Sequence, residues 1–209
     1  MDTIIMGVLY AASVIGLTFI IERGLALRVA KVMPPEVKSA LETCRTTEDL
    51  PMLSRICQQH PSPLARLLLR AERNRHYSRA ENTGGLETAA RHEVSRLERG
   101  LVVLEITVGI APLLGLVGTI YGLIRLFGEL GASGMGDNSR LAGNIALALN
   151  ATLLGLVTAI PSLVAWSYYN KKIETMAIEM ASLCDGFLLQ LYHRNDAREE
   201  AEPPAARRS

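Results

Sequence analysis

The 209-residue chain is poor in the residue types that mark catalytic or metal sites, and only 5% of it is aromatic. Its three cysteines form no C-x-x-C pair, and an odd number without such spacing is typical of unpaired thiols. The four histidines have no partner at a metal-ligand spacing, and there is neither a phosphate-binding P-loop nor a serine or cysteine in a nucleophile motif. These absences argue against an enzyme and predict no metal and no other cofactor.

Charge of a single sign is also lacking. The 22 lysines and arginines nearly balance the 21 aspartates and glutamates, and the basic residues form no patch interleaved with aromatic side chains. Such a composition predicts no nucleic-acid partner. What the chain has in abundance is apolar sequence, gathered into three long runs that alternate with two strongly charged segments. This pattern is typical of a protein embedded in a lipid bilayer with a water-exposed portion.

The three apolar runs, Thr3–Ile21, Leu101–Phe127 and Leu141–Tyr168, are each long enough to cross a bilayer, which takes about 20 helical residues. The first run has an acidic start and no small-residue cleavage site, so we expect an uncleaved membrane helix. Basic residues follow the first run, precede the second and follow the third. This distribution predicts an amino terminus outside the cytoplasm and a carboxyl terminus inside it.

The predicted fold is an all-α membrane protein with three transmembrane helices, the second and third extended into the cytoplasm, and a helical cytoplasmic domain between the first and second. Gly84 and Gly85 are expected to break a helix in that domain, and a helix from Leu86 is expected to continue into the second span. Met176, Met180, Leu183, Phe187 and Leu191 form one apolar stripe beyond the third span. The expected segments are a first transmembrane helix (1–24), a cytoplasmic domain (25–100), a second transmembrane helix (101–127), an outer loop (128–140), a third transmembrane helix (141–169), a cytoplasmic helix extension (170–193) and a disordered tail (194–209).

Two threonines stand out among the small residues of the second and third spans. Thr119 and Thr152 lie at nearly equal distances from the outer loop, so antiparallel helices place both hydroxyl groups at about the same depth. They fit tight helix packing, or a narrow pore or partner-helix slot lined by hydroxyl groups. Packing itself is predicted to involve Pro112, Gly115, Gly118, Gly122, Gly155 and Pro161.

No Asp, Glu, His or Lys lies near the middle of any span, because Glu22, Glu105 and Glu129 all stand toward the ends. A protein that works with a proton gradient needs a group that binds and releases the proton. If this chain does so, that group must come from another subunit.

The motifs GIAPLLGLVGTIYGLI and NATLLGLVTAIPSLVAWSYYNKKIE resemble the ExbB/TolQ/MotA family of ion-driven motor proteins, and the ExbB/TolQ branch is the closest. IERGLALR and SPLARLLLRAER add to the resemblance, which covers most of residues 1–193. It implies a homopentamer in the inner membrane, surrounding transmembrane helices of an ExbD- or TolR-like single-span partner that carries a membrane aspartate. It also implies a TonB- or TolA-like protein as a further partner, and it identifies Thr119 and Thr152 as the family's pore threonines.

The sequence departs from this family in one place. Many relatives have a glutamate early in the third span, in the pattern A-E-A-L-x-x-T, and Leu147 stands there in this chain. We hypothesise that Asn150 takes part of that role in the proton pathway. Glu105 either attracts protons to the cytoplasmic mouth or anchors its helix, and Arg125 either reaches outward or pairs with Glu129.

The resemblance therefore predicts a stator or channel subunit of a motor that is driven by the proton motive force and energises TonB-type outer-membrane transport. The alternatives are a TolQ-like subunit for envelope integrity, a gliding-type motor subunit, and a membrane channel or scaffold without motor work.

Overall fold

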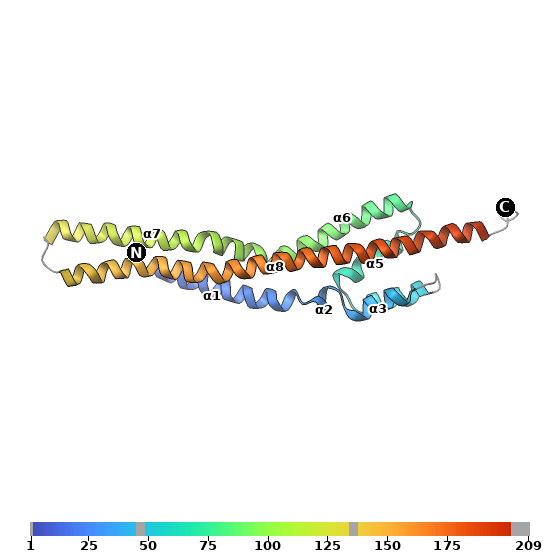
Figure 1. The fold of residues 1–209 in the computed structure, drawn as a ribbon, viewed down its shortest axis with the longest axis horizontal. Helices are drawn as coiled ribbons and strands as arrows, with labels where there is room; N and C mark the ends of the chain where they lie inside the picture. Colours follow the sequence, from blue (N-terminus) through green and yellow to red (C-terminus); the bar gives the residue numbers. More distant parts are fainter. Residues whose placement is uncertain (1, 45–48, 134–137, 202–209) are drawn as a thin grey trace. The chain divides into compact units, whose positions relative to one another are not determined.

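The computed structural model describes residues 2–44, 49–133 and 138–201 (Figure 1). These residues contain no β-strand, which confirms the predicted all-α class. Their helices are α1 (Asp2–Ala26), α2 (Val29–Val32), α3 (Pro35–Thr43), α4 (Leu50–Gln59), α5 (Pro63–Arg73), α6 (Arg79–Glu98), α7 (Leu101–Ser133) and α8 (Asn138–Ala201).

Three helices are long and apolar enough to cross a membrane. The candidate spans are Ile4–Ala26 in α1, Leu101–Gly131 in α7 and Ala148–His193 in α8. Each exceeds the roughly 20 residues that a bilayer requires. The protein is therefore a multi-pass membrane protein built from helices.

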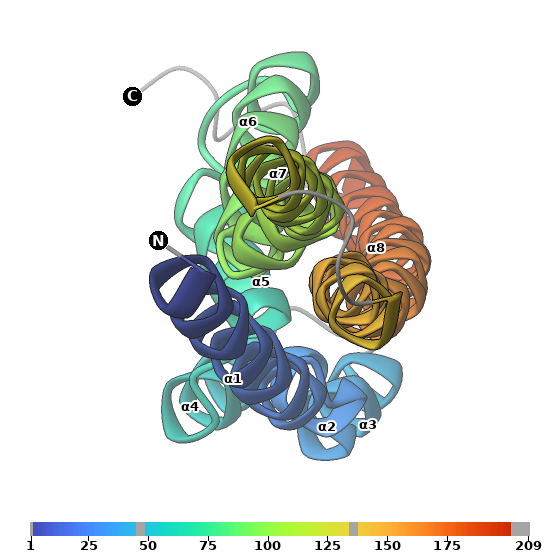
Figure 2. The same ribbon diagram turned by 90° about the vertical axis from the view of Figure 1, so that its left-hand side faces the viewer.

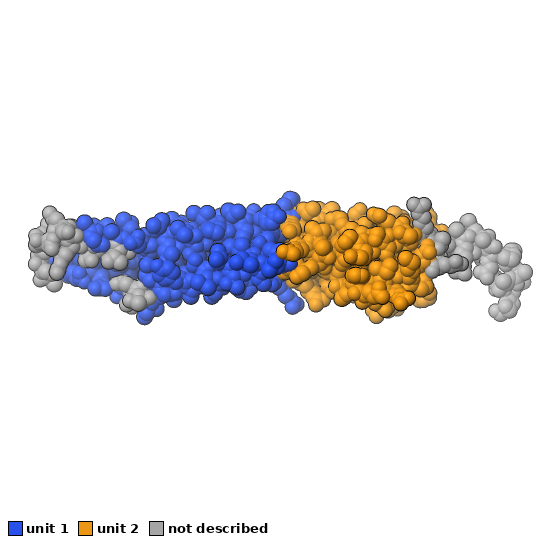
Figure 3. All heavy atoms as spheres, turned by 90° about the horizontal axis from the view of Figure 1, so that it is seen from below, with its two compact units in different colours: residues 1–25, 99–171 blue, residues 26–98, 172–209 orange. Residues whose placement is uncertain are grey.

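The chain divides into two compact units, coloured separately in Figure 3. Unit 1 consists of Met1–Leu25 and Arg99–Lys171, and unit 2 consists of Ala26–Glu98 and Lys172–Ser209. Helix α8 contributes to both, because the boundary at Lys171 falls inside it. Each unit has its own core.

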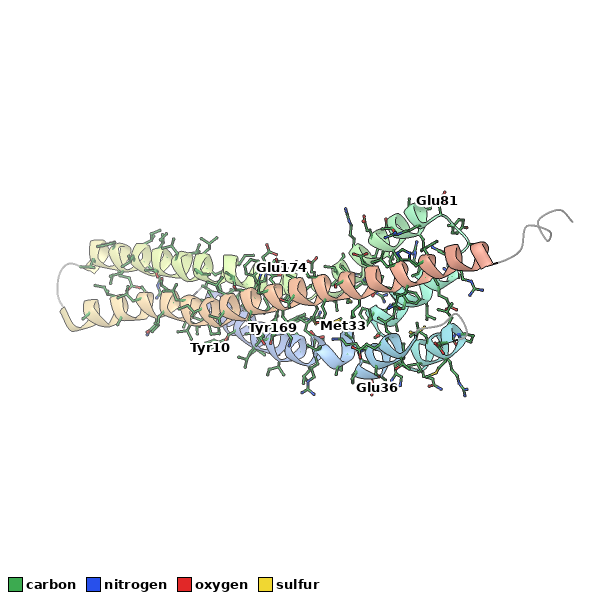
Figure 4. All side chains as sticks on the ribbon, turned by 45° about the vertical axis from the view of Figure 1, so that its right-hand side comes forward. Tyr10, Met33, Glu36, Glu81, Tyr169 and Glu174 are labelled. Atoms are coloured by element: carbon green, nitrogen blue, oxygen red, sulfur yellow. The ribbon has the colours of Figure 1, made fainter. Side chains whose placement is uncertain are left out.

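In unit 1, α1, α7 and the first part of α8 lie side by side (Figure 2). Gly16 of α1 provides a notch, where an added Cβ would lie 3.1 Å from Ser162 Oγ and 3.5 Å from Thr107 Cγ2. Farther along α1, the Tyr169 hydroxyl donates a hydrogen bond of 2.8 Å to the carbonyl of Ile20 (Tyr169 is labelled in Figure 4). Helix α1 is thus held against α8 at two levels.

In unit 2, the core is made of larger apolar side chains. Leu50, Leu53, Leu64, Leu67 and Leu68 are all almost fully buried. The stripe predicted on α8 lies in the same core, since Met176, Met180, Phe187 and Leu191 are buried and Leu183 is half-buried. This burial confirms the apolar pattern beyond the third span.

Two local signals set where the helices of unit 2 begin. Ser62 precedes Pro63, the first residue of α5, and its hydroxyl accepts a hydrogen bond of 3.2 Å from the backbone N–H of Ala65. At the start of α6, Ser78 and Glu81 form a reciprocal capping box: Ser78 Oγ accepts from the Glu81 N–H, and the Glu81 carboxylate accepts from the Ser78 N–H.

The capping box explains one wrong prediction. Gly84 and Gly85 do not break a helix; both lie within α6, which is already nucleated at Ser78. Each glycine costs about 0.5–1 kcal/mol relative to alanine. Burial of Leu86 and Ala89 on the same helix offsets that cost.

A second prediction fails at Gly100. The helix that was expected to run into the second span ends at Glu98, and α7 begins at Leu101. A Cβ on Gly100 would overlap the end of the Arg23 side chain, so the α1 arginine packs against this glycine and would have to shift for a larger residue. The turn between α6 and α7 and the end of α1 are therefore matched to each other.

The helix ends also differ from the expected segments. Helix α7 continues to Ser133 and α8 begins at Asn138, so both take up residues assigned above to the outer loop at 128–140. An ion pair of 3.3 Å between Arg125 and Glu129, one turn apart, supports the last turns of α7. Helix α8 reaches Ala201, well into the expected disordered tail, and residues 202–209 lie outside the described residues.

Candidate functional site

Thr119 on α7 and Thr152 on α8 face each other across the contact between these helices, and their hydroxyl groups are hydrogen-bonded. Thr119 Oγ1 lies 3.2 Å from the carbonyl oxygen of Gly115 on its own helix and 3.2 Å from that of Ala148 on α8. Thr152 Oγ1 lies 3.1 Å from the same Gly115 carbonyl. Both threonines are half-buried. The hydroxyl pair therefore links the two helices to each other and to their backbones.

The hydroxyl pair has fewer protons than contacts. Each hydroxyl carries one proton, so two protons serve the contact between the hydroxyls and the carbonyls of Gly115 and Ala148. If Thr152 donates to Gly115, Thr119 can donate to Thr152. If Thr152 donates to Thr119, Thr119 donates to a carbonyl. Rotation of the two hydroxyl groups thus reverses the hydrogen bond without moving a helix, but neither hydroxyl can store a charge.

Glycine allows the helices to approach closely enough for this pair. A Cβ added to Gly155 would lie 2.6 Å from the carbonyl oxygen of Ala111, and one added to Gly115 would lie 2.8 Å from that of Ala151. Real side chains do not tolerate such distances to a backbone atom, because neither partner can rotate away. The backbones of α7 and α8 are in contact at these two positions, as in close helix packing in membranes.

The Gly118–Gly122 motif lies on the same contact. A Cβ added to Gly118 would lie 2.7 Å from the Cβ of Ala151, and one added to Gly122 would lie 2.8 Å from the Cβ of Ala148. Small residues therefore face small residues on both sides of the hydroxyl pair.

The two prolines predicted to take part in packing differ in exposure. Pro112 is half-buried within α7, and Pro161 is exposed within α8. Each removes one backbone hydrogen bond from its helix. The close approach of α7 and α8 is carried by the glycines, and the packing role of the two prolines stays a prediction.

Glu105 and Asn150 are not brought to the hydroxyl pair. Glu105 is exposed and precedes Thr119 by fourteen residues of helix, which is about 21 Å. Asn150 is exposed and precedes Thr152 by two residues, which is about 160° away around the helix. The side chain of Leu147, where relatives have a glutamate, lies outside the described residues. Asn150 thus faces away from Thr152, on an exposed surface of α8.

Ionisable groups are absent from the level of the hydroxyl pair. Residues 106–124 and 141–170 contain no Asp, Glu, His, Lys or Arg. Arg125, the nearest charged residue, pairs with Glu129, which is one of the two alternatives considered for it. Within the part of the chain that the structure describes, no group of three His, Cys, Asp or Glu side chains could hold a metal ion.

Three further buried hydroxyl groups escaped the sequence interpretation. Thr107, Thr158 and Ser162 are less than 9% exposed, and each donates a hydrogen bond of 2.8–2.9 Å to the carbonyl four residues earlier. Thr107 and Ser162 border the notch of Gly16. The four-residue spacing of Thr158 and Ser162, on the Gly155 side of α8, was the available signal.

Known proteins are similar to this chain over the segment that contains the hydroxyl pair. Residues 59–182 match the family described as the MotA/TolQ/ExbB proton channel family. The chain is 33% identical over 169 residues to biopolymer transport protein ExbB-like 1 of Synechocystis, covering 78% of this chain and 65% of that protein. It is 28% identical over 147 residues to an ExbB homologue of Methanothermobacter thermautotrophicus, covering 70% of this chain and 52% of that protein.

A biopolymer transport protein ExbB of Helicobacter pylori is 36% identical over 81 residues, covering 39% of this chain and 56% of that protein. The matches thus span between about half and two thirds of the length of these curated relatives. The family match includes the whole of α7, the hydroxyl pair and the glycines around it. This multi-pass helical chain belongs to the MotA/TolQ/ExbB proton channel family, and its relatives place it in the ExbB branch.

Proposed function

We propose that this chain forms the static wall of a motor in the bacterial inner membrane that is driven by the proton motive force. Five copies surround transmembrane helices of an ExbD- or TolR-like partner, which supplies the membrane aspartate. The observation that carries the proposal is the hydroxyl pair of Thr119 and Thr152, set in a closely packed contact with no ionisable group at its level.

The chemistry of the pair supports this division of labour. Its hydroxyl groups donate and accept hydrogen bonds and can reverse direction, so they can receive a carboxyl group in either protonation state. They cannot carry a proton across the membrane as a charge. A carboxylate on a second subunit can, since it binds and releases the proton as it meets the two sides in turn.

Glu105 and Asn150 lie on exposed faces of α7 and α8, where a partner or a neighbouring copy can reach them. Both are exposed in the single chain. We assign Glu105 to the cytoplasmic mouth of the proton path, and Asn150 to a polar contact that stands in for the family glutamate. Normal proton flux in Glu105→Gln would exclude the first role, and unchanged motor output in Asn150→Leu would exclude the second.

The proposed orientation follows the distribution of basic residues. The amino terminus is periplasmic, residues 25–100 and 170–193 are cytoplasmic, and the segment that links α7 to α8 faces the periplasm. The force then passes to a TonB- or TolA-like protein that energises transport across the outer membrane.

The decisive experiment is reconstitution of the chain with a single-span partner in proteoliposomes under an imposed proton gradient. Wild type, Thr119→Val and Thr152→Val are compared with an aspartate-to-asparagine variant of the partner. Thr119→Val and Thr152→Val are expected to lower proton flux at least tenfold, and the partner variant is expected to abolish it. Thr119→Ser and Thr152→Ser are the matched controls, because they keep the hydroxyl group.

Proton flux that no variant lowers would exclude the motor. Flux through this chain without any partner would favour a simple channel instead. Subunit counting on the purified complex tests the pentamer separately.

A further inference from the structure

Unit 2 contains a hollow that the proposed proton path does not use. It is a cavity of about 510 Å³ whose floor is α5 and whose sides are α4 and α6. Ser54 and Gln58 line it from α4, and Ala89 and Glu93 line it from α6. This volume is within the range of sites that hold small ligands or short peptide segments. We call it the arginine groove, after the residues of its floor.

The floor carries three arginines in a row. Arg66, Arg70 and Arg73 follow one another at spacings of four and three residues, which places them on one face of α5. Like charges at these spacings repel each other and destabilise a helix. The end of α5 offsets part of this repulsion, because positive charge is favourable near a helix carboxyl terminus. That effect does not explain why all three arginines line a hollow.

Only the first arginine of the row is neutralised within the groove. Arg66 donates to the Glu93 carboxylate in a forked contact, with 2.8 Å between Arg66 Nε and Glu93 Oε1. Glu93 is 8% exposed and is also approached by Arg96 at 3.6 Å. Because Glu93 is engaged in this way, it holds Arg66 in place.

The remaining charges favour an anionic ligand. Among the described residues, no ion pair involves Arg70 or Arg73, although Glu72 also lines the groove. Three arginines against two glutamates leave the groove positive. Beside the charges, the half-buried Leu69 adds an apolar surface.

The length of the row selects among anions. From Arg66 to Arg73 the helix advances about 10.5 Å, so a single phosphate or carboxylate can engage at most two neighbouring guanidinium groups. An extended or helical segment with several carboxylates matches the whole row, and its apolar side chains match Leu69. We propose that the arginine groove binds an acidic peptide segment of a protein partner.

This proposal is independent of the proton path, because every residue of the groove lies in unit 2 and the hydroxyl pair lies in unit 1. The test uses the full chain purified in detergent. The probe is a fluorescein-labelled 14-residue peptide with glutamate at every third or fourth position and leucine between, and binding is followed by fluorescence anisotropy. A peptide with glutamine in place of every glutamate is the control ligand.

Arg70→Glu/Arg73→Glu is expected to weaken peptide binding at least tenfold. Arg91→Glu, which reverses an exposed charge of α6 outside the groove, is expected to change it less than twofold. Arg70→Gln/Arg73→Gln should weaken binding without lowering the melting temperature, since it relieves like-charge repulsion on α5. If these arginines only stabilised the fold, Arg70→Gln/Arg73→Gln would lower the melting temperature and leave peptide binding unchanged.

Three results would overturn the proposal. The first is equal weakening by Arg91→Glu, which would show a diffuse charge effect. The second is displacement of the peptide by inorganic phosphate at equal concentration, which would show a compact-anion site. The third is binding of phosphatidylglycerol vesicles through Arg70 and Arg73 with no binding of the peptide, which would show a lipid site.

Discussion

The two units of this chain solve the same packing problem with different side chains. In unit 1, α7 and α8 touch through glycine and alanine, and the polar groups between them are hydroxyls. In unit 2, leucines and methionines fill the core, and charged pairs such as Arg66–Glu93 and Lys38–Glu179 join its helices. Both units are helical, so secondary structure does not explain the difference.

The solvent explains it. In water, burial of apolar surface contributes about 25 cal/mol per Å², so large side chains are the effective core residues. In lipid, helices gain little from burying apolar surface against each other, because the lipid tails are equally apolar. Close approach of backbones and hydrogen bonds between helices then decide which faces associate. The glycines of unit 1 and the leucines of unit 2 thus report two different surroundings.

Gly155→Leu should have the largest effect, because it attacks the close approach itself. The new side chain would meet the Ala111 carbonyl, and neither backbone can move aside without separating α7 from α8. We expect a loss of more than about 4 kcal/mol of stability in unit 1. Trp166, the only tryptophan, lies in the unit 1 part of α8, so its fluorescence during thermal unfolding in detergent measures the effect.

Gly109→Leu is the matched control for Gly155→Leu. Gly109 is an exposed glycine of α7, with nothing within 4 Å of an added Cβ. The Gly109→Leu variant should have the same thermal unfolding transition as wild type. Equal destabilisation by the two variants would mean that a leucine disturbs unit 1 wherever it is added, and not through the contact between α7 and α8.

Leu68→Ala tests the opposite kind of core. Leu68 is 1% exposed in unit 2, and its truncation leaves a cavity that should cost about 2–5 kcal/mol. The readout is labelling of Cys57 by a maleimide at pH 7 in a Cys44→Ala/Cys184→Ala background. Burial, with a smaller contribution from Glu72, raises the pKa of the Cys57 thiol to about 11, so labelling reports opening of the unit.

Labelling of Cys57 in Leu68→Ala should be at least about thirtyfold faster, because every 1.4 kcal/mol is a factor of ten. Met52→Ala, at a position that is 54% exposed, should leave the rate within about twofold. If Leu68→Ala also lowered the Trp166 transition by the same amount, the two units would not be separate cores.

Glu93→Gln probes the charged contacts of unit 2 and should cost about 1–3 kcal/mol at pH 7. The hydrogen bond from Arg66 holds the pKa of Glu93 below its usual 4.5, against the opposing effect of burial. Its stabilisation is therefore complete above about pH 4.5 and is lost as the pH falls through the lower folded-state value. The difference in the free energy of unfolding between wild type and Glu93→Gln, measured with urea, should close in that range. A gap that stays constant down to pH 2 would contradict the ion pair.

Thr158→Val should have the smallest effect, below about 1 kcal/mol, because its hydroxyl bonds a carbonyl of its own helix. Thr152→Val removes a hydrogen bond between helices and should cost more, up to about 1.7 kcal/mol. Trp166 fluorescence measures both. The reverse order would mean that burial of the hydroxyl matters more than its partner across the helix contact.

The sequence predicted most of this fold, because membrane helices can be recognised by the length and apolar composition of their segments. It also predicted the stripe from Met176 to Leu191, since a helix in water that packs one face into a core repeats its apolar residues at regular spacing. Besides the ends of α7 and α8, the errors fell at glycines. Gly84 and Gly85 continue a helix, whereas Gly100 ends one, and the difference lies in neighbours far away in sequence or in a cap at Ser78.

The site was predicted in part for the same reason. Thr119 and Thr152 were singled out by their depth, but depth alone left both packing and pore lining open. The direct bond between the hydroxyls depends on the rotation of both helices about their axes, which no local pattern specifies. Thr107, Thr158 and Ser162 were missed because the sequence around a hydroxyl residue in an apolar helix is the same whether that residue faces lipid or a neighbouring helix.

By itself, the sequence determined the helical class, the segments that can cross a membrane, and that the level of the two threonines holds no charge. These properties follow from the local order of side chains along the chain. Only the tertiary structure decided that Gly115 and Gly155 bring two backbones into contact, that the two hydroxyl groups bond each other there, and that three arginines line a groove in unit 2. Each of these depends on distances between residues that are remote in sequence, and such distances are set by packing.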